Sequence, residues 1–257
     1  MITFANSPVR IEAPSGTFNL LASTASISIS NPRRETQKFG TAGFHSQVFD
    51  GPMVGQLSVA YYMTDSDTGV RTLFEGDQGI QLFDANVGAY RLYSGVATSM
   101  SMSIEPYSIV SCTLDISFYN GYDQGGATSI LTSPEDLIHG GASDASGNLL
   151  WTNDIISANY SLNQDISPVY PFGELMPSGY TRGGGTVEVD LEGTGFGSIL
   201  DFSGICDGYT TGYINLTGVC ASTTGGQIPF SGYITDPSLS LGANQEIVGS
   251  LSVAGTI

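Results

Sequence analysis

Apolar and polar residues alternate along many short segments of this chain, and clusters of Gly, Asn, Asp and Ser separate the segments. In 185–192, Val187, Val189 and Leu191 alternate with acids, and in 110–118 every second residue is apolar. An alternation with a period of two places one kind of residue on each face of a β-strand. The pattern therefore predicts a mainly β protein whose strands bury one face and expose the other.

Four blocks of the sequence occur twice, in the same order. They pair 25–40 with 158–173, 55–62 with 185–192, 69–76 with 197–204, and 94–118 with 231–255. The last pair aligns without a gap from a shared Ser-Gly at its start. A fixed order of four matching blocks indicates a duplicated unit of about a hundred residues.

The duplication divides the chain into four parts. These are an N-terminal arm (1–24), a first β domain (25–118), a Gly- and Asp-rich connector (119–157) and a second β domain (158–257). Each domain is predicted to be a small β-sandwich or barrel with one short flanking helix, near 69–75 and near 197–203. Ser133 as N-cap and Pro134 after it predict one more short helix in the connector.

The charge balance excludes one class of function. The 257 residues include 24 Asp and Glu but only 7 Lys and Arg, for a formal net charge of −17. A protein that grips nucleic acid needs clustered cations, which this chain lacks. Solubility is the simplest reason for such acidity.

The few basic residues are unevenly placed. Residues 1–128 hold six basic and eleven acidic residues, whereas 129–257 hold one and thirteen. Arg33, Arg34 and Lys38 lie together in the predicted loop 31–40. A basic loop on one unit and an acidic second unit favour head-to-tail contacts between copies, although a solvated loop explains the cluster equally well.

The sequence offers little for catalysis or metal binding. His45 and His139 lie in unlike contexts, and no GxSxG, HExxH or phosphate-loop motif occurs. Asp-containing turns at 65–69, 144–148 and 207–212 could hold calcium, but Asp, Gly and Asn are also typical of hairpin turns. We therefore expect no enzyme, no cofactor and no metal site.

Glu188, Asp190 and Glu192 form a row of like charge that could include a carboxylate pair for sugar hydrolysis. In the aligned first unit their counterparts are Ser58, Ala60 and Tyr62, so no acid pair is repeated. The single Trp151 also provides no aromatic platform for a sugar. The row is therefore predicted to be an exposed strand face without catalysis.

Cys112, Cys206 and Cys220 are odd in number and have no CxxC spacing, which favours free buried thiols and a reducing cytoplasm. The first residues lack the pattern of a secretory signal. No apolar segment approaches the ~20 residues of a membrane span, so no membrane partner is expected.

The predicted elements have the same order in both units: a strand, a long loop, a second strand, a short helix and a final hairpin. An N-terminal arm precedes the first unit. With the hairpin pattern "SG…T…S.S…V…L.I", this order resembles the tail tube (major tail) proteins of long-tailed bacteriophages. The resemblance covers about three-quarters of the chain and depends on order and duplication more than on single residues. It implies tail-tube-like β-sandwich or barrel domains, and three chains with two fused domains each would make a ring of six.

The resemblance implies a virion structural protein, made in the host cytoplasm and located in the virion tail. Trimeric, pseudo-hexameric rings would stack into a tube, contact other phage tail proteins and let genomic DNA pass without specific binding. The lumen-facing residues would be Glu188, Asp190 and Glu192 in the second unit and Gln56, Ser58 and Ala60 in the first. Arg33, Arg34 and Lys38, with the arm, are candidates for contacts between subunits or rings.

Three alternatives to the tail tube are compatible with the sequence. Related domains also build baseplate hubs, distal tail rings and tail terminators. A β-rich module that binds a receptor or glycan would also suit the Gly-, Tyr- and Asn-rich loops, and a calcium-assisted glycosidase is a more distant possibility.

Overall fold

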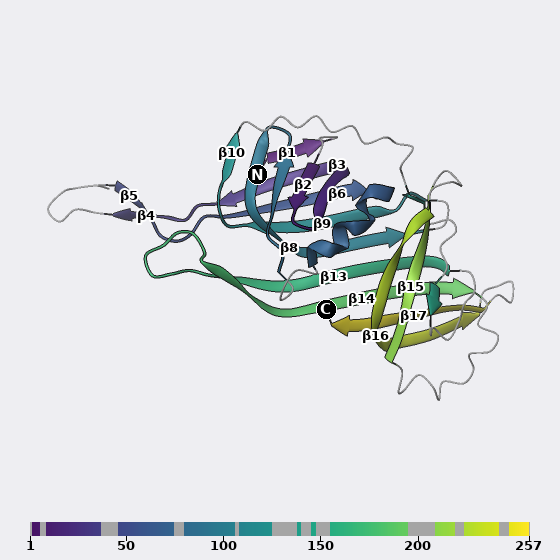
Figure 1. Cartoon of the computed structure of the whole chain (residues 1–257). Coiled ribbons are helices and arrows are strands. Elements are labelled where there is room, and N and C mark those ends of the chain that lie inside the picture. The colour runs from purple at the N-terminus through teal and green to yellow at the C-terminus, as the bar shows by residue number, and fades with distance from the viewer. Residues whose placement is uncertain are drawn as a thin grey trace.

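The computed structural model describes residues 2–5, 9–36, 46–74, 80–105, 108–124, 138–139, 145–147, 155–194, 209–218, 224–241 and 247–256. The protein is mainly β, as predicted, and all pairings between its described strands are antiparallel (Figure 1). Fifteen described strands belong to one sheet. Strands β4 (Arg33–Thr36) and β5 (Ser46–Phe49) form a separate hairpin.

Six strands close into a barrel. Around the barrel they follow the order β8 (Tyr90–Ile104), β7 (Phe83–Val87), β2 (Val9–Ala13), β3 (Gly16–Ser30), β6 (Val54–Tyr62) and β9 (Ser111–Phe118). Strand β9 then pairs back onto β8. Closure gives every strand two neighbours, which removes the open edges that an isolated sheet would expose.

The apolar positions of the alternating strands form the core of the barrel. The predicted shared face of 110–118 is confirmed, because its five apolar residues are all buried: Val110, Cys112, Leu114, Ile116 and Phe118. In the alternating segments 55–62 and 185–192, the apolar residues are buried as well: Leu57, Val59, Tyr61, Val187, Val189 and Leu191. The period of two therefore correctly predicted which residues face inward.

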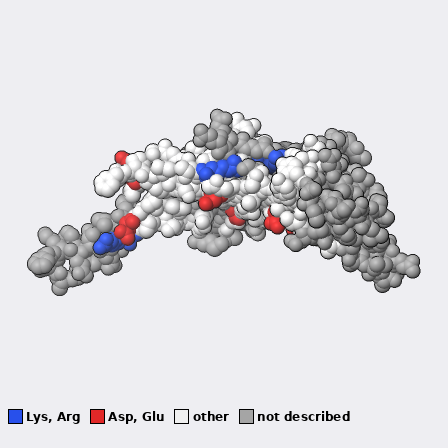
Figure 2. All heavy atoms as spheres, turned by 90° about the horizontal axis from the view of Figure 1, so that it is seen from below, with Lys and Arg blue, Asp and Glu red and all other residues white. Residues whose placement is uncertain are grey.

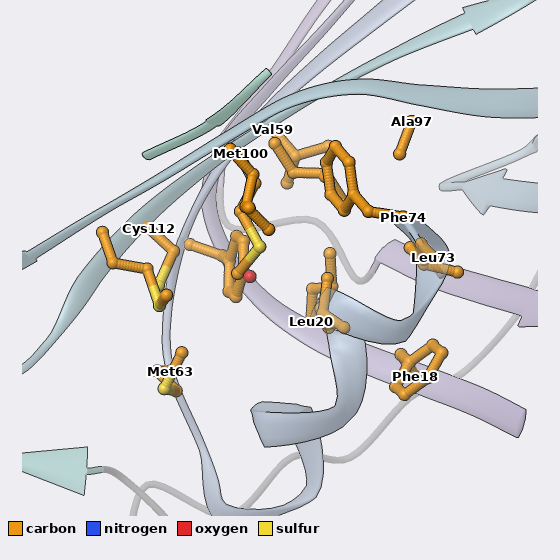
Figure 3. Close-up of a cluster of buried hydrophobic side chains, with 14 of the residues drawn as sticks. Phe18, Leu20, Val59, Met63, Leu73, Phe74, Ala97, Met100 and Cys112 are labelled. Atoms are coloured by element: carbon orange, nitrogen blue, oxygen red, sulfur yellow. The ribbon is translucent and has the colours of Figure 1, made fainter. Parts of the chain in front are cut away.

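A 3-10 helix, η1 (Asp65–Phe74), packs on this core. Its residues Val70, Leu73 and Phe74 are buried in the same cluster as Leu20 and Val59 (Figure 3). The helix predicted near 69–75 is present, but it begins earlier and has 3-10 geometry. The helices predicted near 197–203 and at Ser133 lie outside the described residues.

Part of the predicted N-terminal arm belongs to the barrel. Strand β2 pairs with both β3 and β7, and its Val9 and Ile11 are fully buried. Strand β1 (Ile2–Ala5) pairs with β3 further along. Strand β2, which lies outside the repeated sequence, therefore completes the barrel.

Five more strands extend the sheet from β8. They follow the order β13 (Ile155–Val169), β14 (Gly179–Thr194), β17 (Ile247–Thr256), β16 (Thr224–Leu241) and β15 (Tyr209–Gly218). Three short strands come from the predicted connector: β10 (Tyr122–Gln124) pairs with β8, while β11 (Ile138–His139) and β12 (Ala145–Gly147) pair with β15. The connector therefore adds strands to both parts of the sheet.

The two parts of the sheet join along β8. Strand β7 pairs with β8 as far as Gly95, and β13 pairs with the same strand from Ser99 to Ile104. Gly95 stands at the change of neighbour, where a Cβ atom would lie 2.5 Å from the ring of Phe118. Its equivalent in the second unit, Gly232, has the carbonyl of Ala254 in the same place. The glycine of the repeated Ser-Gly thus stands where a neighbouring strand leaves no room for a Cβ atom.

The two units share one strand order. The first has β3, β6, β9, β8 and β7 as successive neighbours, and the second has β13, β14, β17, β16 and β15. The final hairpins agree even in register, because Ala97 opposes Ile116 and Ile234 opposes Val253. This common order supports the duplication, while the division into two domains stays a prediction because the sheet is continuous.

The sequence alignment of one block is wrong by two residues. Leu57 lies opposite Ile116, and the residue opposite Val253, the equivalent of Ile116, is Val189 rather than Val187. Segment 55–62 therefore corresponds to 187–194. A shift by two leaves every side chain on its original face, so the alternation alone could not detect it.

Two hairpins project from the same side of the molecule, β4–β5 and the long end of β13–β14 (Figure 1). The β13–β14 hairpin packs on the barrel through a second apolar cluster of Val96, Tyr119 and Ile166, against which Val54, Ile80 and Tyr180 pack. The rings of Tyr119 and Tyr180 lie 5.6 Å apart. Burial raises the pKa of Tyr180 to about 12.

Candidate functional site

One continuous polar face crosses both parts of the sheet, over strands β3, β6, β9, β8, β13, β14, β17 and β16. Directly opposed residues in an antiparallel sheet share a face, so the pairings trace rows across it. One row runs Ala60, Thr113, Ser101, Ser161, Glu188 and Ala254. The next runs Tyr62, Ser111, Ser103, Asn159, Asp190 and Ser252. We call the surface that carries these rows and their alternate neighbours the polar face.

The structure brings the six predicted lumen residues onto this one face. Gln56 and Ser58 are exposed and Ala60 is partly buried, while the three acids of the second unit are exposed. With the corrected alignment, Gln56 is the counterpart of Glu188, Ser58 of Asp190 and Ala60 of Glu192. The sequence alignment gave Ser58, Ala60 and Tyr62 as the counterparts, which is wrong by two residues. The alternation cannot detect a shift by two, because every residue stays on the same face.

Hydroxyl groups accompany the acids of the polar face. The Ser99 hydroxyl donates to Asp115 Oδ2 at 2.7 Å and the Ser157 hydroxyl donates to Glu192 Oε2 at 3.2 Å. Ser252 also donates to Asp190. These hydrogen-bond donors to the three carboxylates are neutral hydroxyl groups, and none of the residues in the two rows is Lys or Arg.

The repulsion along the acid row is weak enough to tolerate. Residues two apart on a strand are separated by about 7 Å, and two unit charges at that distance in water repel by about 0.6 kcal/mol. Salt reduces this further. The row therefore destabilises the fold only slightly and places three exposed negative charges on this part of the polar face.

Two shallow hollows lie on the polar face. The larger, of about 440 Å³, lies between β3, β6, β9 and β8, where Ser26, Ser58, Ser99 and Asp115 line it. The smaller, of about 200 Å³, includes Ser101, Asn159, Glu188 and Asp190. Both are lined mainly by hydroxyl, amide and carboxylate groups, and the described residues contain no group of three potential metal ligands.

Two basic residues lie outside the rows of the polar face, on strands that close the barrel. Arg91 binds Asp84 at 3.0 Å and Glu12 at 3.4 Å, and Arg10 binds Glu12 at 3.1 Å. The hydrogen bond to Asp84 raises the pKa of Arg91. These ion pairs link β2, β7 and β8, so the positive charge there is matched within the barrel.

The predicted contact residues Arg33 and Arg34 lie exposed on β4, opposite Phe49 and Val48 of the projecting hairpin. Lys38 lies outside the described residues. In Figure 2, Asp and Glu atoms lie along the lower edge of the described central part, and Lys and Arg atoms lie along its upper edge. Further Asp and Glu atoms lie at the left of this view, where a group of Lys and Arg atoms also lies.

The other sequence candidates contribute little to a site. Segment 65–69 begins η1, and 145–147 forms β12. His139 lies in β11, while His45, Cys206 and Cys220 lie outside the described residues. Cys112 is buried, as predicted.

Sequence reasoning missed two exposed apolar sites. At the tip of the β13–β14 hairpin, Phe172, Leu175 and Met176 are exposed, and the last two border a hollow of about 230 Å³ beside Tyr119. On β15 and β16, Tyr209 and Tyr233 meet edge to face with ring centroids 5.3 Å apart. Apolar residues between Pro and Gly in "PVYPFGELMPSG" were the available signal for the first site.

No protein-family model matches the chain, and no curated protein matches it. Within the part of the chain that the structure describes, no helix is long and apolar enough to span a membrane.

Proposed function

We propose that this protein is a virion structural protein of the phage tail-tube type. Each chain contributes two tandem tail-tube-like units, three chains form a pseudo-hexameric ring, and stacked rings form a tube for genome passage. The observation that carries the proposal is the polar face, which is continuous over both units and whose rows contain acids but no cation. The proposed role is assembly and conduction, without catalysis.

Such a face suits a conduit for DNA. Proteins that bind DNA place Lys and Arg against phosphates and release counterions, which gives most of the nonspecific affinity. A wall of serine, threonine, asparagine and carboxylate groups makes no such contacts, and its negative potential repels the phosphates. DNA would therefore slide along it without a binding minimum.

The duplication suits a ring of six similar units. Both units offer the same strand order, and β8 of the first pairs with β13 of the second. A repeated joint between equivalent elements generates a ring if its rotation closes. Exposed Arg33 and Arg34 on the projecting hairpin are candidates for contacts with acidic surfaces of neighbouring copies or rings.

Electron microscopy of the purified protein at high concentration tests the assembly directly. Rings or tubes with a sixfold outline and three chains per ring are expected. A protein that remains monomeric at every concentration would contradict the proposal.

A charge variant tests the lumen. The triple change Glu188→Lys, Asp190→Lys and Glu192→Lys should leave assembly intact, because the three side chains are exposed, but should slow genome delivery by particles that carry it. The matched neutral variant Glu188→Gln, Asp190→Asn and Glu192→Gln should deliver normally. If the lysine variant ejects DNA as the wild type does, these residues do not line the conduit.

A second candidate is a receptor- or glycan-binding virion module. The exposed pair Tyr209 and Tyr233, with exposed Tyr213 nearby on β15, offers an aromatic surface on which a sugar could stack. Binding of the monomer to a glycan array, abolished by Tyr233→Ala, would favour this function. The related tail positions (hub, distal ring and terminator) would be separated from the tube by imaging assembled particles.

A further inference from the structure

The joint between the two units has a defined register. Strand β8 pairs with β13 so that Ile104 opposes Ala158, Met102 opposes Tyr160 and Ser101 opposes Ser161. Strand β13 pairs with the same edge of β8 as β7 does, beyond the point where the pairing with β7 ends. It also carries the polar face from the first unit into the second.

The equivalent edge of the second unit has no partner among the described strands. Strand β16 corresponds to β8, because Ser238 opposes Ser250 just as Ser101 opposes Thr113. Strand β15 covers β16 only from Thr224 to Tyr233. Beyond that point, the described pairings of β16 are with β17 alone.

The matching edge in the first unit belongs to β3, the equivalent of β13. There β1 occupies the place that β8 takes on β13: Phe4 opposes Ala25, and Ile2 opposes Ile27. The two strands that meet this edge or its equivalent share an apolar–polar–apolar sequence with the part of β16 beyond β15. The three segments are Ile2-Thr3-Phe4 in β1, Met102-Ser103-Ile104 in β8 and Leu239-Ser240-Leu241 in β16.

We propose that β16 of one copy pairs with β3 of a second copy in the register that β8 uses on β13, and that β1 holds this edge in the free chain until it is displaced. Applying the internal register places Leu241 opposite Ala25, Leu239 opposite Ile27 and Ser238 opposite Ser28. Pro237 lacks an N–H group, so we end the ladder at Ser238. This inference builds on the proposed ring and specifies its joint.

The exchange is balanced in backbone pairs. The incoming strand replaces the four pairs that β1 makes with β3 by four equivalent ones, so β1 delays association without making the joint unfavourable. Pairing would also cover a part of β16 that no described strand covers, and an uncovered strand edge promotes aggregation. The polar face would then continue from each chain into the next.

Cysteine pairs test the register. In the whole protein, Ser28→Cys with Ser238→Cys should form disulfides between chains under mild oxidation, up to a covalent trimer. The matched internal pair, Ser101→Cys with Ser161→Cys, should form a disulfide within one chain. Each single variant is the control for reactions of the native thiols.

A reversible lock tests the role of β1. Thr3 opposes Ser26, so Thr3→Cys with Ser26→Cys should fix β1 on β3 when oxidised. The oxidised protein should stay monomeric, and reduction should restore assembly. Equal assembly of the oxidised and reduced forms would overturn the displacement of β1.

The outcomes separate this joint from the proposed function. Rings without a disulfide between positions 28 and 238 would overturn the joint and leave the tube proposal standing. Disulfide-linked chains that form open filaments or pairs instead of rings would support the joint and contradict the ring. Absence of both rings and the disulfide would overturn both.

Discussion

The two units of this protein share a strand order but differ in how their described strands close. In the first, β2 from outside the repeat fills the space between β7 and β3, and six strands close into a barrel. In the second, the described neighbours of the outer strands are β8 on one side and β11 and β12 on the other. Among the described strands, only those of the first unit close into a barrel, and the strand that completes this barrel lies outside the repeated sequence.

The units also differ in the chemistry of their polar face. Gln56, Ser58 and Ala60 in the first unit are replaced by acids at the equivalent positions of the second. The buried alternates remain apolar in both. The two units thus share the apolar core pattern, on which folding depends, and differ in the exposed face.

The largest expected effect is a difference in unfolding free energy between core variants of the closed barrel and core variants of the second unit. Leu114 in β9 and Leu191 in β14 are both almost completely buried, each on a strand with two neighbours. Because a closed barrel collapses less around a cavity, Leu114→Ala should lower the unfolding free energy by about 4 kcal/mol and Leu191→Ala by about 2 kcal/mol. Urea unfolding of both variants measures this, and equal losses would contradict the contrast.

A smaller, local effect concerns the β13–β14 hairpin. Ile166 contributes to the second apolar cluster, against Val96 and Tyr119. Ile166→Ala should destabilise the hairpin by about 2 kcal/mol, and Ile166→Val by about 1 kcal/mol. Hydrogen exchange should accelerate in 163–186 and stay unchanged in the barrel strands. Faster exchange throughout the barrel would show that the hairpin is part of its cooperative unit.

Alkaline pH should loosen the same hairpin. Burial favours the neutral phenol of Tyr180, so its pKa is raised from 10.0 to about 12. The corresponding stability is fully present below pH 10 and is lost as the pH rises toward 12. Tyr180→Phe should reduce this loss, followed by hydrogen exchange and phenolate absorbance. A residual loss is expected because burial also raises the pKa of Tyr119 and Tyr170.

The smallest effect is expected from making the first unit resemble the second. The triple change Gln56→Glu, Ser58→Asp and Ala60→Glu adds acids on the polar face and should change the unfolding free energy by less than about 0.5 kcal/mol per site. Added salt should reduce the change, because the charges are exposed. A loss of several kcal/mol in urea unfolding would show that the two faces are not equivalent.

The alternation of apolar and polar residues by itself determined that the chain is mainly β, which residues face inward and which six candidate residues share a face. It also predicted the final hairpin, whose strands pair as expected. Each of these depends on local periodicity, which the sequence carries directly. The burial of Cys112 follows from the same alternation.

Only the tertiary structure decided the closure of the barrel by β2, the joint between β8 and β13, and the true partner of each strand position. Val9 and Ile11 belong to a short alternating segment that predicts a strand. The local sequence does not indicate that this strand pairs with β3 and β7. The alignment of 55–62 failed by two residues because such a shift preserves every face. Register and closure depend on contacts between residues far apart in the chain, which a periodic pattern does not encode.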